Sequence, residues 1–135
     1  MTIAVDFDGT IVEHKYPDIG KEKPFAIETL KALSKRGVKI ILWTSREGKL
    51  LEDAVEYCRN RGLEFYAINS NTPEGNLFSG RDNGAKILAD VFIDDRNLGG
   101  IPEWGTIYEM LIGMRKPVKK KRSLFKKLWK KLFRR

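Results

Sequence analysis

The sequence predicts an α/β protein built on a three-layer, doubly wound parallel sheet, followed by an amphipathic C-terminal helix. Two observations support the sheet: short apolar runs alternate with segments of helical periodicity, and the apolar runs end in polar residues. With 135 residues, 41% apolar and 33% charged, the chain can form one core of its own. A single cysteine excludes an internal disulfide, and no apolar stretch reaches the length of a membrane span.

The first half of the chain contains two expected strands and one helix. Residues 3–5 form an apolar run that ends at Asp6, which predicts a strand. A helix is expected from Pro24, a favoured first residue, to a stop at Gly37. Its apolar face would carry Ile27, Leu30 and Leu33. Residues 38–43 are apolar at five of six positions and predict a second strand that is covered on both faces.

The second half continues the alternation. A helix ending at Gly62 is predicted by an apolar stripe made of Leu50, Leu51, Ala54, Val55 and Cys58, which also favours a buried, unreactive thiol. Strands are expected at residues 64–68 and 89–93, and a closing helix at residues 104–114. Residues 69–82 form a polar, Gly-rich segment without periodicity, and a loop of this length in a compact domain favours a functional role. Strands that alternate with helices indicate a parallel sheet with right-handed crossovers.

The charge divides the chain into a domain, residues 1–114, and a tail, residues 115–135. The domain holds all 18 acidic residues and 14 of the 26 basic ones, a net charge of −4, whereas the tail holds 12 basic residues and no acidic one. The overall charge of +8 therefore belongs to the tail. Because the N-terminus lacks a signal-peptide pattern, the chain is expected in the cytoplasm, with the tail as a candidate peripheral membrane anchor.

Polar residues of similar chemistry follow three of the expected strands. They are Asp6 and Asp8 after the first strand, Thr44, Ser45 and Arg46 after the second, and Asp94 and Asp95 after the fourth. Ligands of open parallel sheets bind beyond the carboxyl ends of the strands, so these residues mark the expected site. Four carboxylates would repel one another without a cation, and oxygen-only donors favour Mg²⁺. Lys86 is the nearest basic residue that could neutralise an anionic substrate.

These residues resemble the four motifs of the haloacid dehalogenase-like superfamily of phosphotransferases. The motifs are D-x-D-G-T at residues 6–10, an apolar strand ending at Thr44, a lysine at Lys86 and an apolar run into Asp94-Asp95. They occur in the family's order and span nearly all of residues 1–114. The resemblance implies a Rossmannoid sheet of strand order 5-4-1-2-3 and a phosphatase that cleaves phosphomonoesters through an aspartyl phosphate.

The resemblance also implies a role for each motif residue. Asp6 would be the nucleophile that attacks phosphorus, and Asp8 would protonate the leaving oxygen and then deprotonate the attacking water. Thr44 would hydrogen-bond a phosphoryl oxygen, with Ser45 as the second candidate for that task. Lys86 would balance the charge on the transferring group.

A Mg²⁺ ion is implied beside the nucleophile. Its ligands would be Asp6, the backbone carbonyl of Asp8 and Asp94, with Asp95 joining through water. Gly9 would let the chain turn tightly and expose backbone N–H groups to the phosphate.

Plainer interpretations stand beside these roles. Strand-end aspartates such as Asp95 also cap the next element. Arg46 could bind substrate or form a surface ion pair, and His14 could be a solvated loop residue or a substrate contact. Trp43 is expected to pack on the sheet. For the whole chain, the alternative is a non-catalytic binding or assembly module that uses the tail and keeps a vestigial acidic site.

Motif order excludes two other classes of phosphoryl-handling protein. A receiver domain places its acidic pair after the first strand and its phosphoacceptor aspartate after the third strand, where this chain has Ile68-Asn69. The phosphate loop of nucleotide-binding proteins, G-x-x-x-x-G-K-[ST], does not occur in the sequence.

Spacing between the motifs leaves no room for a cap domain. Residues 11–23 alone separate the first motif from the first helix, and one helix, one strand and a loop fill the interval from Thr44 to Lys86. The resemblance to the superfamily then implies an open site, which suits bulky or surface-bound phosphorylated substrates or a roof supplied by a neighbouring subunit.

The tail has the pattern of an interfacial helix. Ser123 can cap a helix whose one half carries Leu124, Phe125, Leu128, Trp129, Leu132 and Phe133, while the other half carries nearly all the Lys and Arg residues. This pattern predicts that residues 123–135 bind an anionic membrane surface, with self-association or a protein partner as the next alternative. Nucleic acid is less favoured, because a phosphate-binding arm needs no apolar face.

Overall fold

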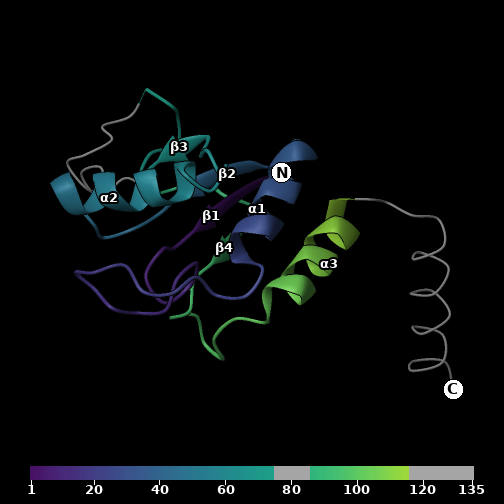
Figure 1. Cartoon of the computed structure of the whole chain (residues 1–135). Coiled ribbons are helices and arrows are strands. Elements are labelled where there is room, and N and C mark those ends of the chain that lie inside the picture. The colour runs from purple at the N-terminus through teal and green to yellow at the C-terminus, as the bar shows by residue number, and fades with distance from the viewer. Residues whose placement is uncertain (75–85, 116–135) are drawn as a thin grey trace, which may run out of the picture.

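Strands and helices alternate along the chain in the computed structural model, which describes residues 1–74 and 86–115 (Figure 1). The elements are β1 (Thr2–Val5), α1 (Ala26–Lys35), β2 (Lys39–Leu42), α2 (Gly48–Arg59), β3 (Ala67–Ile68), β4 (Val91–Ile93) and α3 (Trp104–Arg115). They have the type and order that the sequence predicts. Residues 75–82 of the expected functional loop and the tail beyond Arg115 lie outside the described residues, so the predictions about them stay predictions.

The four strands form one parallel sheet in the order β3-β2-β1-β4. β1 is central: residues 2–5 pair with residues 39–42 of β2, and Val5 lies opposite Ile93 of β4. The α/β fold with a Rossmann-like parallel sheet is therefore confirmed. The strand order agrees with the 4-1-2-3 part of the expected sheet, and the described residues contain no fifth strand.

Side chains of β1 and β2 alternate between the two faces of the sheet. Ile3 and Val5 belong to the main core, where they meet apolar side chains of all three helices, including Leu30, Leu33, Leu51, Cys58, Trp104 and Leu111. Ala4 and Ile41 belong to a smaller cluster that includes Ala67 and Ile87. The described helices thus share one face of the sheet. A helical layer on the second face, and the absence of a cap, stay predictions.

Several elements are shorter than the expected ranges, among them β2 and β4, and for α1 and β3 the backbone gives the reason. α1 begins at Ala26 and not at Pro24, because Phe25 between them has a left-handed backbone with φ 65°. β3 begins at Ala67, since the chain joins the ladder only at the Tyr66 N–H, which donates to the Ile40 carbonyl at 2.8 Å.

Cys58 and Trp43 lie where the sequence places them. Cys58 is fully buried in the main core, which confirms its expected place there, and burial raises the pKa of its thiol to about 12, which favours the unreactive protonated form. Trp43 packs against the smaller cluster of the sheet.

In the described parts of the chain, no helix combines the length and the apolarity that crossing a bilayer requires.

Candidate functional site

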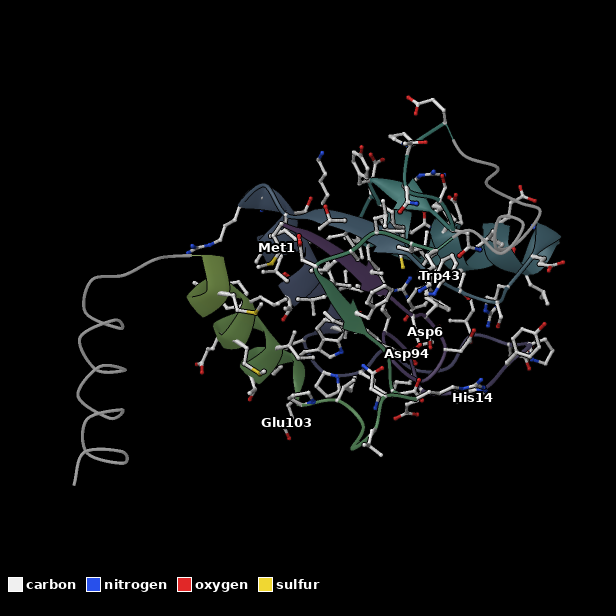
Figure 2. All side chains as sticks on the ribbon, turned by 180° about the vertical axis from the view of Figure 1, so that it is seen from behind. Met1, Asp6, His14, Trp43, Asp94 and Glu103 are labelled. Atoms are coloured by element: carbon white, nitrogen blue, oxygen red, sulfur yellow. The ribbon has the colours of Figure 1, made fainter. Side chains whose placement is uncertain are left out.

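Three carboxylates meet where β1 and β4 end. Asp6 directly follows β1, and Asp94 and Asp95 directly follow β4, its neighbour in the sheet. One oxygen from each carboxylate can be chosen so that all three lie within 4.8 Å of one another. Figure 2 shows Asp6 and Asp94 together at this edge of the sheet. We call this group the acidic triad.

A buried threonine holds the two halves of the acidic triad together. The Thr10 hydroxyl accepts a hydrogen bond from the Asp95 N–H at 3.0 Å and lies 3.2 Å from Asp95 Oδ1 and 3.4 Å from Asp6 Oδ2. The Thr10 carbonyl in turn accepts a hydrogen bond at 3.0 Å from the Trp104 indole at the start of α3. Neither contact is expected from the sequence, although Thr10 belongs to the first motif.

Gly9 allows the two strand ends to approach each other. Its φ of +84° lies in the region that favours glycine, and a Cβ at this position would overlap the Asp95 carboxylate. The Gly9 N–H itself donates to the Val12 carbonyl at 2.8 Å, so any backbone N–H groups that the turn exposes to a phosphate would come from its neighbours. The tight turn itself is confirmed.

Burial and mutual repulsion disfavour the state in which all three carboxylates of the acidic triad are negatively charged. Burial and then the negative charge of Asp94 raise the pKa of Asp6 to about 7, with smaller contributions from Asp95 and Asp8, although the Phe7 N–H acts in the opposite direction. A divalent cation would remove this repulsion. The residues present fit Mg²⁺, because the donors are carboxylate oxygens and the triad contains neither His nor Cys.

The raised pKa of Asp6 predicts a pH-dependent stability of the metal-free protein. Between pH 4 and pH 7 the native state holds a proton on Asp6 that the unfolded state has lost, so Asp6 destabilises the fold increasingly as the pH rises. Asp6→Asn cannot ionise. After allowance for solvent screening, it should gain about 2 kcal/mol over wild type between pH 4 and pH 8. Urea unfolding of chelator-treated protein at several pH values measures this; a pH-independent difference would contradict it.

A cleft of about 480 Å³ opens over the triad. It is lined by Asp6, Asp8, His14, Tyr16, Ser45, Asp94 and Arg96. The structure thus brings together four residues that the sequence predicted for the site, Asp6, Asp8, Ser45 and Asp94. Tyr16 and Arg96 were missed. His14 is exposed and also lines the cleft, so the two interpretations given for it are compatible.

Thr44 and Ser45 differ in exposure. Ser45 is exposed and lines the cleft, whereas Thr44 is 1% exposed. The Thr44 N–H donates to Asn69 Oδ1 at 2.8 Å, and the Thr44 hydroxyl accepts from the Arg46 N–H at 3.2 Å. Asn69 is fully buried with φ 52°, and its Nδ2 is the buried side-chain polar atom without a partner in the described parts. Of the two residues expected to hydrogen-bond a phosphoryl oxygen, Ser45 is therefore the one with an exposed hydroxyl.

Lys86 and Arg46 do not lie where the sequence analysis expected them. Lys86 is exposed and does not line the cleft; within residues 1–74 and 86–115 no ion pair joins it to a carboxylate. Arg46 is fully buried, so the surface ion pair considered for it is wrong: its partner is Asp8, at 2.7 Å in the interior. Arg46 also does not line the cleft, so a substrate bound there would not contact its buried side chain.

Comparison with known proteins supports the fold. No protein-family model and no curated protein matches the chain. A solved structure of a conserved protein from Bacteroides thetaiotaomicron is 61% identical, with a TM-score of 0.75 over 86% of this chain and 92% of that one. This chain belongs to the family of that protein. At this level of identity, the parallel α/β architecture described above is shared within the family, while the chemistry of the site follows from its side chains.

Proposed function

We propose that this protein is a Mg²⁺-dependent phosphatase of the haloacid dehalogenase-like type that hydrolyses phosphomonoesters through an aspartyl phosphate on Asp6. One observation carries the proposal: the acidic triad lies at the ends of two neighbouring parallel strands, and two of its members, Asp6 and Asp94, line a cleft. This is the position at which open parallel sheets bind ligands. The order of the four motifs along the chain supports the same chemistry.

Asp6 and Asp8 supply the groups that the reaction needs. A carboxylate oxygen of Asp6 bonds to phosphorus while the bond from phosphorus to the ester oxygen breaks. Asp8, which lines the same cleft, gives its proton to the leaving oxygen. Water then attacks phosphorus, its proton returns to Asp8, and the bond between Asp6 and phosphorus breaks. Inorganic phosphate and the free alcohol are the products.

Other residues of the cleft would bind the metal and the phosphate. Asp6 and Asp94 would hold Mg²⁺ with the backbone carbonyl of Asp8, and Asp95 lies near enough to join them. The bound ion supplies charge neutralisation for the phosphoryl oxygens. Ser45 would donate its exposed hydroxyl to a phosphoryl oxygen. Arg96, whose N–H donates to Asp94 Oδ1 at 2.9 Å, would supply the positive charge that Lys86 was expected to supply.

The open side of the cleft favours a large substrate. His14 and Tyr16 are both exposed on its rim, where an aromatic or polar leaving group can contact them. We therefore expect phosphomonoester substrates that are larger than small sugar phosphates.

The test is a phosphatase assay with matched metal conditions. The full chain should release phosphate from an aryl phosphate in Mg²⁺, lose this activity in EDTA and regain it when Mg²⁺ is restored. Mg²⁺ alone should raise the thermal unfolding temperature by binding only the folded state. A protein that binds Mg²⁺ but hydrolyses no phosphomonoester, across nucleotide, sugar, peptide and lipid-headgroup phosphates, would contradict the proposal and favour the non-catalytic alternative.

A further inference from the structure

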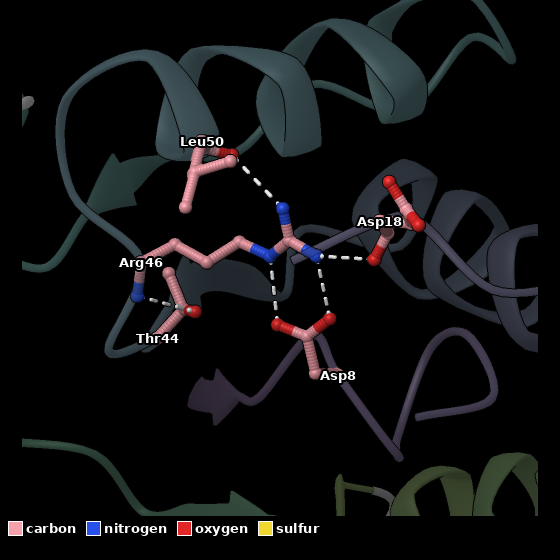
Figure 3. A network of polar contacts seen from close by, with 5 residues as sticks. All are labelled: Asp8, Asp18, Thr44, Arg46 and Leu50. Carbon is pink, nitrogen blue, oxygen red and sulfur yellow. Dashed lines mark hydrogen bonds and ion pairs between the residues drawn. The ribbon is translucent and has the colours of Figure 1, made fainter. Parts of the chain in front are cut away.

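Arg46 is a fully buried arginine whose donors meet three separate segments of the chain (Figure 3). Its Nε and one terminal nitrogen donate to the two oxygens of Asp8, each at 2.7 Å. The same terminal nitrogen donates to the Asp18 carbonyl at 2.9 Å, and the other terminal nitrogen donates to the Leu50 carbonyl at 3.2 Å. The guanidinium is therefore fixed at both ends of its fork.

Two aromatic rings complete the surroundings of the guanidinium. Its central carbon lies 5.2 Å from the ring centroid of Phe7 and 5.2 Å from that of Tyr16. Phe7, which stands between Asp6 and Asp8 in the sequence, is fully buried. Tyr16 is one of the residues that line the cleft. A buried cation needs such contacts together with a full set of acceptors. The guanidinium that binds Asp8 thus also lies close to the rings of Phe7 and Tyr16.

The partner of this cation is the carboxylate next to the reacting atoms. The Asp8 side chain is 12% exposed and lines the cleft, whereas Arg46 does not. Since the two hydrogen bonds engage both oxygens of Asp8, the carboxylate cannot rotate without breaking one of them. Each oxygen keeps a second lone pair, so a proton can be carried on the cleft side while the fork stays in place.

We propose that Arg46 is a positioning residue that holds the Asp8 carboxyl group in the orientation required for proton transfer to the leaving oxygen. This role rests on the proposed phosphatase function and adds to it a residue outside the cleft. Arg46 contacts neither substrate nor reacting atoms. It acts through Asp8 alone. Its effect on the first step, the transfer of the phosphoryl group to Asp6, should therefore depend on whether the leaving oxygen needs a proton, whereas its effect on the second step, in which Asp8 takes the proton of water, should be the same for every substrate.

Two aryl phosphates of similar shape separate this role from a general structural one. Phenyl phosphate needs a proton on its leaving oxygen, whereas 2,4-dinitrophenyl phosphate releases a stable phenolate without one. In Arg46→Lys, which keeps the charge but loses the fork, we expect kcat/KM for phenyl phosphate to fall about 10²-fold, the usual worth of general acid catalysis. This ratio covers only the steps up to the transfer of the phosphoryl group to Asp6, so we expect kcat/KM for 2,4-dinitrophenyl phosphate to fall less than about threefold.

A control variant tests whether the effect is specific to Arg46, and a double variant replaces Arg46→Lys if that variant does not fold. Arg59→Lys changes an arginine whose ion pair with Glu56 is exposed, and it should leave both rates unchanged. If Arg46→Lys does not fold, as thermal unfolding and circular dichroism would show, the double variant Asp8→Asn/Arg46→Met removes both buried partners, a change that folds tolerate better than the loss of one. The double variant should be no slower than Asp8→Asn on phenyl phosphate, because Arg46 has no other route to the reaction.

The outcomes distinguish the two proposals. Equal losses of kcat/KM on both substrates in Arg46→Lys, or a double variant that is much slower than Asp8→Asn, would overturn the positioning role while leaving the phosphatase function intact. A wild-type protein that hydrolyses neither substrate in Mg²⁺ would overturn the phosphatase function, and the positioning role with it.

Discussion

Asp6→Asn is expected to lose phosphatase activity by a factor on the order of 10² or more at saturating Mg²⁺, equivalent to about 3 kcal/mol of transition-state stabilisation. An amide nitrogen or oxygen cannot form the acyl phosphate, and the variant also loses one donor of the acidic triad. Folding should be preserved, since the Asp6 side chain is only half-buried and its raised pKa already favours an uncharged group. Steady-state rates with phenyl phosphate and 2,4-dinitrophenyl phosphate measure the loss.

Controls for Asp6→Asn isolate the nucleophile. Asp53→Asn makes the same substitution on α2, where Asp53 pairs with Lys49 far along the chain from the triad, and it should keep full activity. A rapid acid quench during turnover should trap phosphate on the wild-type protein in a form that hydroxylamine releases, and none on Asp6→Asn. Wild-type rates in Asp6→Asn would remove Asp6 as the nucleophile.

Gly9→Ala should have the second large effect, because it combines two penalties. A left-handed backbone costs an alanine about 1 kcal/mol, and the new methyl group displaces the Asp95 carboxylate from its Thr10 contact, for a total of about 3 kcal/mol in the free energy of unfolding. The displacement also disturbs the acidic triad. We therefore expect the Mg²⁺-dependent rise in unfolding temperature to shrink or disappear.

Gly99→Ala is the matched control for Gly9→Ala. Gly99 has nearly the same φ, +83°, but nothing lies within 4 Å of its Cβ position. It should cost about 1 kcal/mol for backbone strain alone and leave the response to Mg²⁺ unchanged. Equal effects of the two substitutions in urea unfolding would show that the approach of Asp95 to Gly9 contributes nothing.

The elements and the acidic triad could be predicted because both depend on local patterns. Apolar runs and helical stripes fix the strands and helices, and the carboxyl ends of parallel strands always meet at one edge. Asp6 and Asp94 therefore had to be neighbours once β1 and β4 were placed side by side. The implied strand order of the phosphatase family gave that pairing, which the sheet confirms.

The partners of Arg46 and Thr10 could not be predicted because they depend on how distant segments pack. A buried guanidinium needs acceptors, and those of Arg46 include the backbone carbonyls of Asp18 and Leu50, which no side-chain pattern marks. The bond between Thr10 and Trp104 joins residues 94 positions apart. Two missed residues did carry a sequence signal: Thr10 ends the first motif, and Arg96 directly follows Asp94 and Asp95.

The central place of β1 has a consequence for the order in which the protein can be assembled on the ribosome. β1 is synthesised first, and β2 can pair with one of its edges as soon as about 40 residues have emerged. The other edge must wait for β4, and the contact between Thr10 and Asp95 spans 85 residues. Until then the nascent chain exposes an unpaired apolar strand that can pair with another chain. β1, which directly precedes Asp6, is thus synthesised first but is paired on both edges only after β4 has emerged.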